Sequence, residues 1–415
     1  MQARIHRGAR EIGGSCVELE EAGKRIVIDV GLPLDADSEA DLQLPPVPGL
    51  AGRDPSLLGV LVSHPHPDHY GLVAAVDPSV PIYIGESAQR ILNEAALFTR
   101  GGIRLQAAGF LQDRVPHEIG LFRVTPYLMD HSAFDAYALL VEAGGHRLLY
   151  SGDIRAHGRK SRLFEQFIAQ PPGDVDTLLL EGTHVRDGEA RVAGLSEREV
   201  EDRCLDVLRQ TDGMVLACYS PQNIDRVVTM FRAAKRGGRR LVFDLYAAEV
   251  ARATGRADTI PQAEWEDVRV FVPLTQRIRV KNERAFDRIE RVKPHRLYPE
   301  QLAPQADKLV MTFRYSMAAE LDRAGCLAGA QAIWSMWPGY LDEPAGIRLR
   351  NWLDRRGIPM TLAHSSGHAS VEDLQRFAAA VNPERLVPIH TSAPQLFPGS
   401  FERVRIHEDG EWWTV

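Results

Sequence analysis

The stretch Ser63-His64-Pro65-His66-Pro67-Asp68-His69-Tyr70-Gly71 places three imidazoles and one carboxylate within six residues. Imidazole and carboxylate are the ligand types that hold zinc or manganese while leaving coordination positions for water. The two prolines stiffen the segment and should exclude a regular helix, so the ligands would converge at low entropic cost. A solvated histidine-rich turn is the simpler alternative, but this dense pattern favours a metal-binding loop.

Four short apolar runs in the first half of the chain each end in a polar or turn residue. Continuous apolar runs of this kind are typical of strands that are buried on both faces. In layered α/β folds, functional residues usually lie on loops just past such strand ends. The predicted strand segments are 25–31, 57–63, 147–153 and 177–182.

Further ligand candidates follow predicted strands downstream: His131, Asp153 and His390. Taken alone, a histidine or aspartate after a strand is more often a cap or turn residue. Their joint presence, in this order after the first cluster, favours a shared metal site instead.

The middle of the chain alternates predicted helices and strands. Ser196-Glu197-Arg198-Glu199 matches a capping box, and apolar residues follow it at helical spacing. A second helix is expected over 223–236, and strands over 214–218, 241–243, 309–311 and 332–334. This alternation predicts parallel α/β units, and therefore a second domain at about 194–360.

Composition narrows the class of protein. The chain has 415 residues, a net charge of −7, 44% hydrophobic and 25% charged residues, which excludes wholesale disorder and a strongly basic nucleic-acid coat. Its four cysteines lie far apart and predict reduced buried thiols. With no apolar leader and no run of about 18 apolar residues, we expect a cytoplasmic protein without a membrane partner.

The order of these motifs resembles the metallo-β-lactamase superfamily. HxHxDH, a separate histidine, an aspartate in Ser151-Gly152-Asp153 and a late histidine follow its pattern, and Asp29 matches its early structural aspartate. Three further segments resemble the motifs of its β-CASP nucleases, of the ribonuclease J type: Glu181-Gly182-Thr183-His184, Ser366-Gly367-His368-Ala369-Ser370 and Pro388-Ile389-His390.

The resemblance implies a fold and a domain plan. The expected fold is a four-layer αββα metallo-β-lactamase body, split in sequence by an inserted α/β β-CASP domain. The body would comprise residues 1–193 and 361–415, and the insertion residues 194–360. Ribonuclease J usually has an additional C-terminal domain, whereas this chain ends soon after His390.

The resemblance also implies a role for each site residue. His368 would contact the scissile phosphate or protonate the leaving oxygen, Glu181 would orient it, and Asp68 would belong to the catalytic group. Asp29 would support the ligand loop. The first metal would be bound by His64, His66 and His131, the second by Asp68, His69 and His390, and both by Asp153; phosphate contacts would come from His364, Ser366, Gly367 and His368.

The implied activity is hydrolysis of phosphodiester bonds in single-stranded nucleic acid, RNA rather than DNA, by a hydroxide that two divalent ions activate. Zinc is favoured over manganese, although such ligands accept both. Three alternatives stay open: a DNA-directed nuclease, a small-molecule hydrolase acting on a thioester, lactone or β-lactam, and an inactive binding scaffold. A homodimer is compatible with the sequence, and endonuclease and exonuclease action are not distinguished.

Basic clusters could line a groove for a phosphate backbone or lie on solvated surfaces. Segment 275–296 has eight lysines and arginines against three acids, and smaller clusters lie at 235–240 and 155–162. The cluster that follows Asp153 is the best placed for a phosphate. Trp334, Trp337, Trp412 and Trp413 are expected in cores or interfaces rather than as base-stacking platforms.

Overall fold

The computed structural model describes residues 1–34, 36, 43–99, 101–186 and 194–415. The chain forms two compact units, of which the first comprises Met1–Leu92, Ile103–Gly194 and Gly367–Val415. The second comprises Asn93–Gly102 and Leu195–Ser366. The sequence did not anticipate that the short segment 93–102 belongs with the second unit. The expected domain limit at residue 193 lies outside the described residues.

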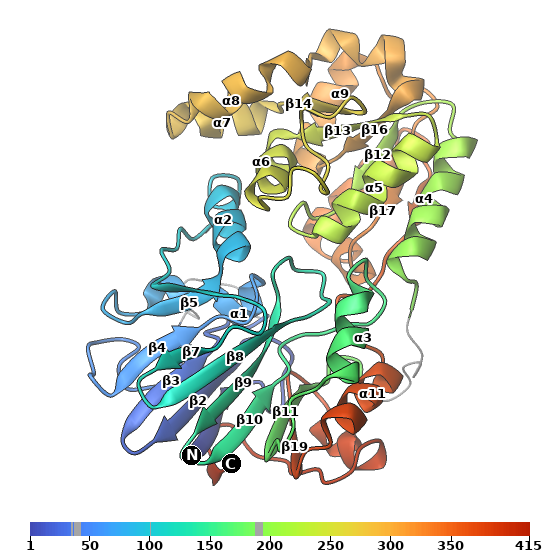
Figure 1. Ribbon diagram of the computed structural model, residues 1–415. Coiled ribbons are helices and arrows are strands. Elements are labelled where there is room, and N and C mark those ends of the chain that lie inside the picture. Colours follow the sequence, from blue (N-terminus) through green and yellow to red (C-terminus); the bar gives the residue numbers. More distant parts are fainter. Residues whose placement is uncertain (35, 37–42, 100, 187–193) are drawn as a thin grey trace. The chain divides into compact units, whose positions relative to one another are not determined.

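The first unit contains two β-sheets. Hydrogen bonds order one sheet of seven strands and another of six (Figure 1). In spatial order, the first sheet consists of β20 (Trp412–Thr414), β1 (Gln2–Arg7), β2 (Cys16–Glu21), β3 (Lys24–Ile28), β4 (Leu57–Leu61), β5 (Ile82–Gly85) and β6 (Gly109–Leu111). The second consists of β19 (Arg385–Ile389), β11 (Thr177–Glu181), β10 (His146–Tyr150), β9 (Tyr137–Ala143), β8 (Phe122–Leu128) and β7 (His117–Ile119).

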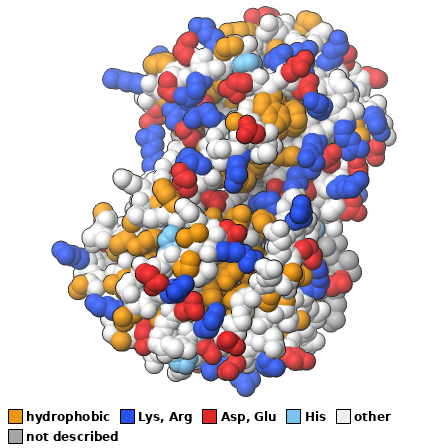
Figure 2. Space-filling model, viewed as in Figure 1, with side chains coloured by type: hydrophobic (Ala, Val, Ile, Leu, Met, Phe, Trp, Pro, Cys, Tyr) orange, Lys and Arg blue, Asp and Glu red, His pale blue; other side chains and the backbone are white. Residues whose placement is uncertain are grey.

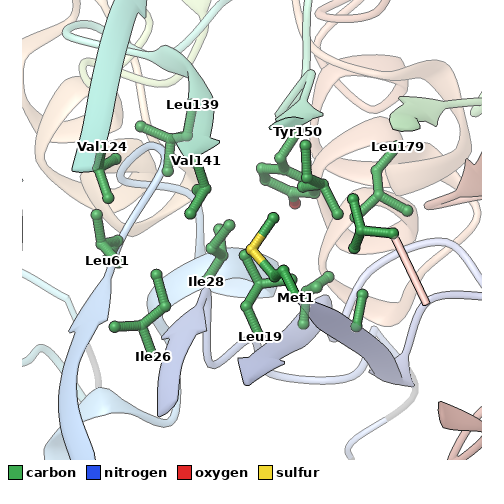
Figure 3. Close-up of a cluster of buried hydrophobic side chains, with 14 of the residues drawn as sticks. Met1, Leu19, Ile26, Ile28, Leu61, Val124, Leu139, Val141, Tyr150 and Leu179 are labelled. Carbon is green, nitrogen blue, oxygen red and sulfur yellow. The ribbon is translucent and has the colours of Figure 1, made fainter. Parts of the chain in front are cut away.

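These two sheets pack face to face around a shared apolar core. Ile26, Ile28 and Leu61 from the first sheet join Val124 and Leu139 from the second in one buried cluster (Figure 3). Burial of such side chains contributes about 25 cal/mol per Å² of apolar surface removed from water, so this interface is a main source of stability for the unit.

Helices cover the outer face of each sheet. Phe164 of α3 (Ser161–Ala169) and Phe377 of α11 (Val371–Val381) share a buried cluster with residues of the second sheet. Ala88 and Leu92 of α2 (Glu86–Ala95) do the same for the first sheet. Helix, sheet, sheet and helix therefore follow one another in layers. The predicted αββα fold is confirmed.

The predicted strands of this unit are also confirmed, and their direction positions the site. All five residues of β11 are buried, as a continuous apolar run requires. Strand β3 pairs in parallel with β4, and β11 pairs in parallel with both β10 and β19. Because parallel strands end at the same edge of a sheet, the residues that follow them gather there.

The second unit is built on one parallel sheet of seven strands. Every strand pair in it is parallel, which confirms the strand–helix alternation read from the sequence. In spatial order the strands are β15 (Arg296–Leu297), β14 (Val268–Phe271), β13 (Arg240–Asp244), β16 (Leu309–Thr312), β12 (Val215–Cys218), β17 (Gln331–Trp334) and β18 (Met360–Leu362).

Side-chain caps fix where the helices of this unit begin. The predicted capping box is present: Ser196 accepts from the Glu199 amide, and the Glu199 carboxylate accepts from the Ser196 amide. Asn223 caps the next helix in the same way. The α-helices are α4 (Glu197–Gln210), α5 (Ile224–Arg236), α6 (Leu245–Ala253), α7 (Leu274–Asn282), α8 (Phe286–Val292), α9 (Ala318–Ala324) and α10 (Pro344–Asp354).

Most of the basic clusters serve the second unit's own structure. Arg288 pairs with Glu94 at 2.7 Å, and Arg291 with Glu249 at 2.9 Å. Lysine and arginine side chains alternate with acidic ones over the face shown in Figure 2. The solvated, ion-paired interpretation therefore fits segment 275–296 better than a phosphate groove.

One of the tryptophans expected in cores or interfaces lies outside a core. Trp334 and Trp413 are buried, whereas the side chain of Trp337 is 57% exposed. The sequence could not reveal this, because an indole is equally apolar inside and outside a core. All four cysteines are buried and unpaired. Of the helices in the described ranges, none combines the length and apolarity that crossing a membrane requires.

Candidate metal centre

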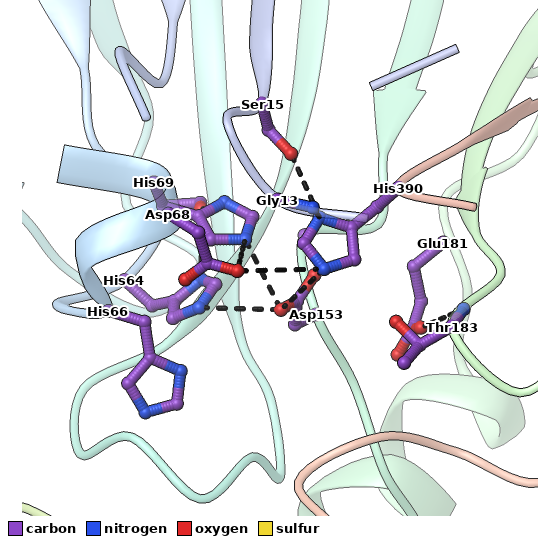
Figure 4. A network of polar contacts seen from close by, with 12 residues as sticks. Gly13, Ser15, His64, His66, Asp68, His69, Asp153, Glu181, Thr183 and His390 are labelled. Atoms are coloured by element: carbon purple, nitrogen blue, oxygen red, sulfur yellow. Dashed lines mark hydrogen bonds and ion pairs between the residues drawn. The ribbon is translucent and has the colours of Figure 1, made fainter. Parts of the chain in front are cut away.

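The HxHxDH segment leaves the end of β4 and includes a short helix. Helix α1 (Pro67–Tyr70) begins with proline at its first position, so the expectation that the prolines exclude a helix here is wrong. Proline is tolerated at that position because the first amides of a helix have no partner within it. The helix carries Asp68 and His69, whose side chains point toward Asp153 and His390 (Figure 4).

Backbone contacts hold this helix against the end of β3. The Val30 amide donates to the His69 carbonyl at 2.9 Å, and the Ser15 amide donates to the Asp68 carbonyl at 3.1 Å. Gly31 is required at the contact, because a Cβ there would lie 1.9 Å from the Asp68 carbonyl oxygen. The ligand segment is therefore fixed by strands that come before it in the sequence.

Three groups of potential ligands form at this centre, of which the third consists of Asp153, Glu181 and His368. Within each group, the ligand atoms lie within 4.8 Å of one another. The first group is His64, His66 and His131, and the second is Asp68, His69, Asp153 and His390.

Asp153 lies at the centre of the second group (Figure 4). Its Oδ2 is 3.2 Å from Nε2 of His69, 3.6 Å from Nε2 of His64 and 3.7 Å from Nε2 of His390. It therefore faces imidazoles from the first two groups. All seven side chains that the sequence nominated as metal ligands meet in the first unit, although they come from four separate parts of the chain.

The polar atoms at this centre suit a cation. The Nε2 atoms of His64, His69 and His390 and both carboxylate oxygens of Asp153 are buried and make no hydrogen bond within the described residues. Leaving so many buried polar atoms unsatisfied costs about 1–3 kcal/mol each. Divalent metal ions accept this set of imidazole and carboxylate ligands. The residue types and the unsatisfied buried atoms therefore fit a divalent metal ion, which these side chains could hold.

Electrostatics prepares most of these imidazoles to bind metal. Burial lowers the pKa of His66 to about 4, and it also lowers the pKa values of His64, His131 and His390. A neutral imidazole keeps the lone pair that a metal needs. Burial alone would raise the pKa of Asp153, but the surrounding imidazoles outweigh it and hold that pKa well below its ordinary value.

Contacts behind the ligands orient the rings. Nδ1 of His131 donates to the Gly367 carbonyl at 2.6 Å, which leaves its Nε2 as the ligand atom. Nδ1 of His390 lies 2.9 Å from Oγ of Ser15. Such partners fix the ring orientation and the basicity of a ligating histidine. Sequence analysis missed Ser15, because an isolated serine in a loop carries no periodic or motif signal.

Asp29 supports the ligand loop through four hydrogen bonds. It accepts from the Ser63 amide and hydroxyl at 2.7 Å each, from His69 Nδ1 at 2.7 Å, and from the Tyr150 hydroxyl at 2.9 Å. Asp29 is fully buried and has a positive φ of 61°. Sequence reasoning anticipated Asp29 here but not Tyr150.

Glu181 and His368 form a polar pair beside Asp153. Oε1 of Glu181 lies 3.3 Å from Nδ1 of His368, and Asp153 Oδ2 lies 3.7 Å from the same nitrogen. Burial disfavours a charge on His368, but the Glu181 and Asp153 carboxylates outweigh it and raise its pKa to about 9. The Thr183 hydroxyl is 3.1 Å from this nitrogen. Both carboxylates therefore favour the protonated form of this imidazole.

The predicted phosphate contacts do not fall in one unit. Gly367 and His368 belong to the first unit, whereas His364 and Ser366 belong to the second. A Cβ at Gly367 would lie 2.7 Å from Oγ of Ser132, so only glycine allows this close approach. A joint phosphate-binding role for the four residues stays a prediction.

Arg155 does not face solvent as a phosphate-binding residue would, although its position soon after Asp153 suggested that role. Its side chain is fully buried, and its Nε lies 3.2 Å from Oδ1 of Asp130. This ion pair ties the loop after β10 to the loop that carries His131. The interpretation of Arg155 as part of a phosphate-binding cluster is therefore wrong.

Comparisons with known proteins agree with this geometry. The Beta-lactamase superfamily domain matches residues 24–215, and the Zn-dependent metallo-hydrolase RNA specificity domain matches residues 360–396. A ribonuclease J from Sinorhizobium meliloti is 24% identical over 390 residues, which are 89% of this chain and 64% of that protein. In these comparisons the chain is similar to ribonuclease J and to the metallo-β-lactamase superfamily.

Other relatives of this ribonuclease J-like chain give the same picture. The ribonuclease J of Mycobacterium tuberculosis is 27% identical over 248 residues, covering 57% of this chain and 43% of that protein. The one from Mycolicibacterium smegmatis is 23% identical over 401 residues, covering 92% and 67%. The chain thus spans between about two fifths and two thirds of the length of these relatives.

A solved structure shares the whole fold of the ribonuclease J-like chain. A protein of unknown function from Enterococcus faecalis V583 superposes with a TM-score of 0.78 and 19% sequence identity. The match covers 100% of this chain and 99% of that one. At this identity the likeness concerns the fold alone.

Proposed function

We propose that this chain is a nuclease that hydrolyses phosphodiester bonds of single-stranded RNA with the help of two divalent ions. The observation that carries the proposal is the position of Asp153, whose Oδ2 lies within 3.7 Å of imidazoles from the first two ligand groups. A shared carboxylate between two ligand groups is the arrangement expected of a two-metal site.

The proposed ligands divide as the sequence suggested. His64, His66 and His131 would hold one ion, Asp68, His69 and His390 the other, and Asp153 both. Bound there, two divalent ions lower the pKa of water and neutralise charge on phosphoryl oxygens. The N/O ligand set favours zinc in our proposal, with manganese as the competing metal.

His368 and Glu181 would handle the proton. The protonated form of His368 is favoured, and its Nδ1–H faces the Glu181 carboxylate at 3.3 Å. Its second N–H is then left for the leaving oxygen of a phosphodiester, which needs a general acid. Glu181 is itself held by the amides of Ile154 and Thr183, each at 3.2 Å, and so would fix the orientation of the acid.

Four further assignments belong to the proposal. RNA rather than DNA is supported by the RNA specificity domain that matches residues 360–396 and by relatives named ribonuclease J. The second unit would be the inserted β-CASP domain. A cytoplasmic location is supported by the four buried, unpaired thiols, and a homodimer stays a prediction.

The test uses end-labelled single strands of RNA and DNA with either a 5′-phosphate or a 5′-hydroxyl. We expect the zinc- or manganese-loaded protein to cleave RNA, and Asp153→Asn and His66→Ala to abolish cleavage. Circular dichroism checks that both variants fold. Undiminished cleavage by Asp153→Asn would refute the mechanism, and thioester hydrolysis without any nuclease activity would favour the small-molecule alternative.

A further inference from the structure

Asp244 and Arg314 lie where the parallel sheet of the second unit changes direction. Strands β13 and β16 are neighbours in this sheet. From β13 the chain continues outward to β14, whereas from β16 it continues to β17, which lies beyond β12 on the other side (Figure 1). Asp244 is the last residue of β13, and Arg314 follows the end of β16 by two residues. In open α/β sheets, ligands bind outside the carboxyl ends of the strands at such a switch point.

Asp244 holds the guanidinium of Arg314 through a single nitrogen. Its Oδ2 accepts from Nε of Arg314 at 2.5 Å and from the side-chain amide of Gln276 at 2.8 Å, and its Oδ1 accepts from the amide of Ala247 at 2.7 Å. Both oxygens of this fully buried carboxylate are thereby occupied. The Nη2 of Arg314 is also buried, yet it has no hydrogen-bond partner within the described residues.

Arg356 of the same unit shows a guanidinium whose donors are satisfied. Its side chain is 29% exposed, against 30% for Arg314, and each of the two lies over an aromatic ring. Arg356, however, donates to Asp322 from both Nε and Nη2 at 2.6 Å, and from Nη1 to the Trp352 carbonyl at 3.0 Å. The contrast indicates that Nη2 of Arg314 is available to an acceptor from outside the described part of the chain.

Tyr246 fixes the position of this guanidinium and adds a second donor. The guanidinium carbon of Arg314 lies 4.9 Å from the centroid of the Tyr246 ring, and that ring stacks on Phe98 with centroids 5.2 Å apart. The Tyr246 hydroxyl accepts from the Gln222 side chain at 2.7 Å, so its own hydrogen stays available to a ligand. Tyr246 also lies in the first turn of α6, where the helix carries partial positive charge.

The chemistry of these open groups favours a phosphate. They are donors, namely a guanidinium nitrogen and a phenolic hydroxyl, and they match the oxygens of a phosphate group, for which the arginine fork is well suited. Because both oxygens of Asp244 already accept hydrogen bonds, the carboxylate serves to orient Arg314. A guanidinium that is held in place before binding loses little conformational entropy when a ligand arrives.

We propose that Arg314 and Tyr246 bind a phosphate group at the switch point of the second unit. The phosphate belongs either to a small phosphate compound such as a nucleotide or to a nucleic-acid strand, and the experiment separates these two sources. The inference goes beyond the proposed nuclease function, because it involves none of the proposed metal ligands and can be tested without cleavage.

The test measures binding to the full-length protein in EDTA, so that no turnover occurs. Isothermal titration calorimetry uses inorganic phosphate and adenosine 5′-monophosphate as probes, and fluorescence anisotropy uses a fluorescein-labelled single-stranded RNA. Arg314→Lys keeps a cation beside Asp244 but loses the fork, so it should weaken binding of the recognised probe about 10- to 100-fold. Tyr246→Phe keeps the ring but loses the hydroxyl donor, and should weaken binding about 2- to 10-fold.

The pattern of losses identifies the source of the phosphate. Weakening confined to inorganic phosphate and adenosine 5′-monophosphate would assign the site to a small phosphate compound. Weaker binding of RNA, with the slope of log K against log salt reduced by about 0.7, would assign it to a strand. Arg356→Lys is the matched control and should leave the affinity for every probe unchanged. Circular dichroism compares the thermal midpoints of all variants.

Unchanged affinity of Arg314→Lys for every probe would overturn the proposal, as would wild-type protein that binds none of them. Equal weakening by Arg314→Lys and Arg356→Lys would also overturn it. Should Arg314→Lys fail to fold, unchanged binding by Tyr246→Phe would refute the site. If the metal-loaded protein cleaves RNA while Arg314→Lys binds every probe as the wild type does, the nuclease proposal stands and the phosphate site fails. If Arg314→Lys loses binding but the metal-loaded wild type cleaves no RNA, the reverse holds.

Discussion

Oε1 of Glu181 lies 3.3 Å from Nδ1 of His368, although 187 residues separate them along the chain. Glu181 is the last residue of β11, and His368 lies shortly before α11, which covers the same sheet. The pair favours a protonated imidazole next to Asp153. In the proposed division of ligands neither residue holds a metal ion, although both lie with Asp153 in a third group of potential ligands.

Glu181→Gln should therefore lower turnover without removing metal. The amide keeps an oxygen for only one of the two backbone donors and no longer stabilises the charged imidazole, so kcat should fall about 10²-fold or more. Metal content, measured by atomic emission, should stay at the wild-type value. The pH profile is decisive: loss of activity should begin at lower pH in the variant, and an unshifted alkaline limb would contradict the pairing.

Asp29→Asn should weaken metal binding although Asp29 is not itself a proposed ligand. Asparagine tolerates the positive φ of 61°, but it cannot accept all four hydrogen bonds that the carboxylate accepts. Loss of such a supporting carboxylate typically costs 10- to 100-fold in metal affinity. Competition with a zinc chelator measures the change. Asp174→Asn, which changes an exposed aspartate that also has a positive φ (51°), should leave the affinity unaltered.

Arg226→Met should destabilise the second unit strongly. The substitution leaves Glu197 buried without its cation, which costs about 3–5 kcal/mol. Arg350→Met, which removes an exposed pair with Asp342, should cost under about 1 kcal/mol. Urea-induced unfolding gives both values. Arg226→Met combined with Glu197→Leu should recover much of the loss, and a double variant as unstable as the single one would argue against an uncompensated charge as the cause.

Glu18 should make the first unit sensitive to acid. Burial raises its pKa, but hydrogen bonds from His6 and Arg25 outweigh burial and hold the pKa below the ordinary value of 4.5. A carboxylate with a lowered folded-state pKa contributes stability above its unfolded pKa, and that stability is lost as the pH falls through the folded value.

In the wild-type protein, the thermal midpoint should thus fall steeply below about pH 4.5. Glu18→Gln should be less stable at pH 7 by about 1–3 kcal/mol, because the amide keeps an acceptor for only one of the two donors, His6 and Arg25. It should also lose less stability on acidification. Scanning calorimetry at pH 7 and pH 4 compares the two slopes. Glu118→Gln, which changes an exposed carboxylate, should follow the wild-type curve.

Much of the fold and of the metal centre follows from local sequence. Apolar runs such as 177–181 predict buried strands, because no other short element buries every side chain. The HxHxDH segment predicts ligands because its residue types and spacing are rare together. Asp153 and His390 could be nominated because each follows such a strand, and parallel strands deliver their ends to one edge.

Partners that lie far away along the chain could not be predicted. Arg155 follows Asp153 so closely that it suggests phosphate binding, yet Asp130 takes its charge inside the protein. Arg288 likewise pairs with Glu94, 194 residues away. The sequence shows only which charges are neighbours along the chain. The tertiary fold decides which of them stay free of ion pairs and can bind a phosphate.

His390 has a positive φ of 53°, and its amide donates to the carbonyl of Gly8 at 2.7 Å. The backbone of His390, one of the seven proposed ligands, is thus held by a residue that is synthesised hundreds of codons earlier. During translation, the strands that carry His64, His69 and Asp153 leave the ribosome long before His390 does. A nascent chain consequently holds an incomplete second ligand group until His390 emerges. A messenger truncated before that codon would yield a product that has the first ligand group but lacks a complete second one.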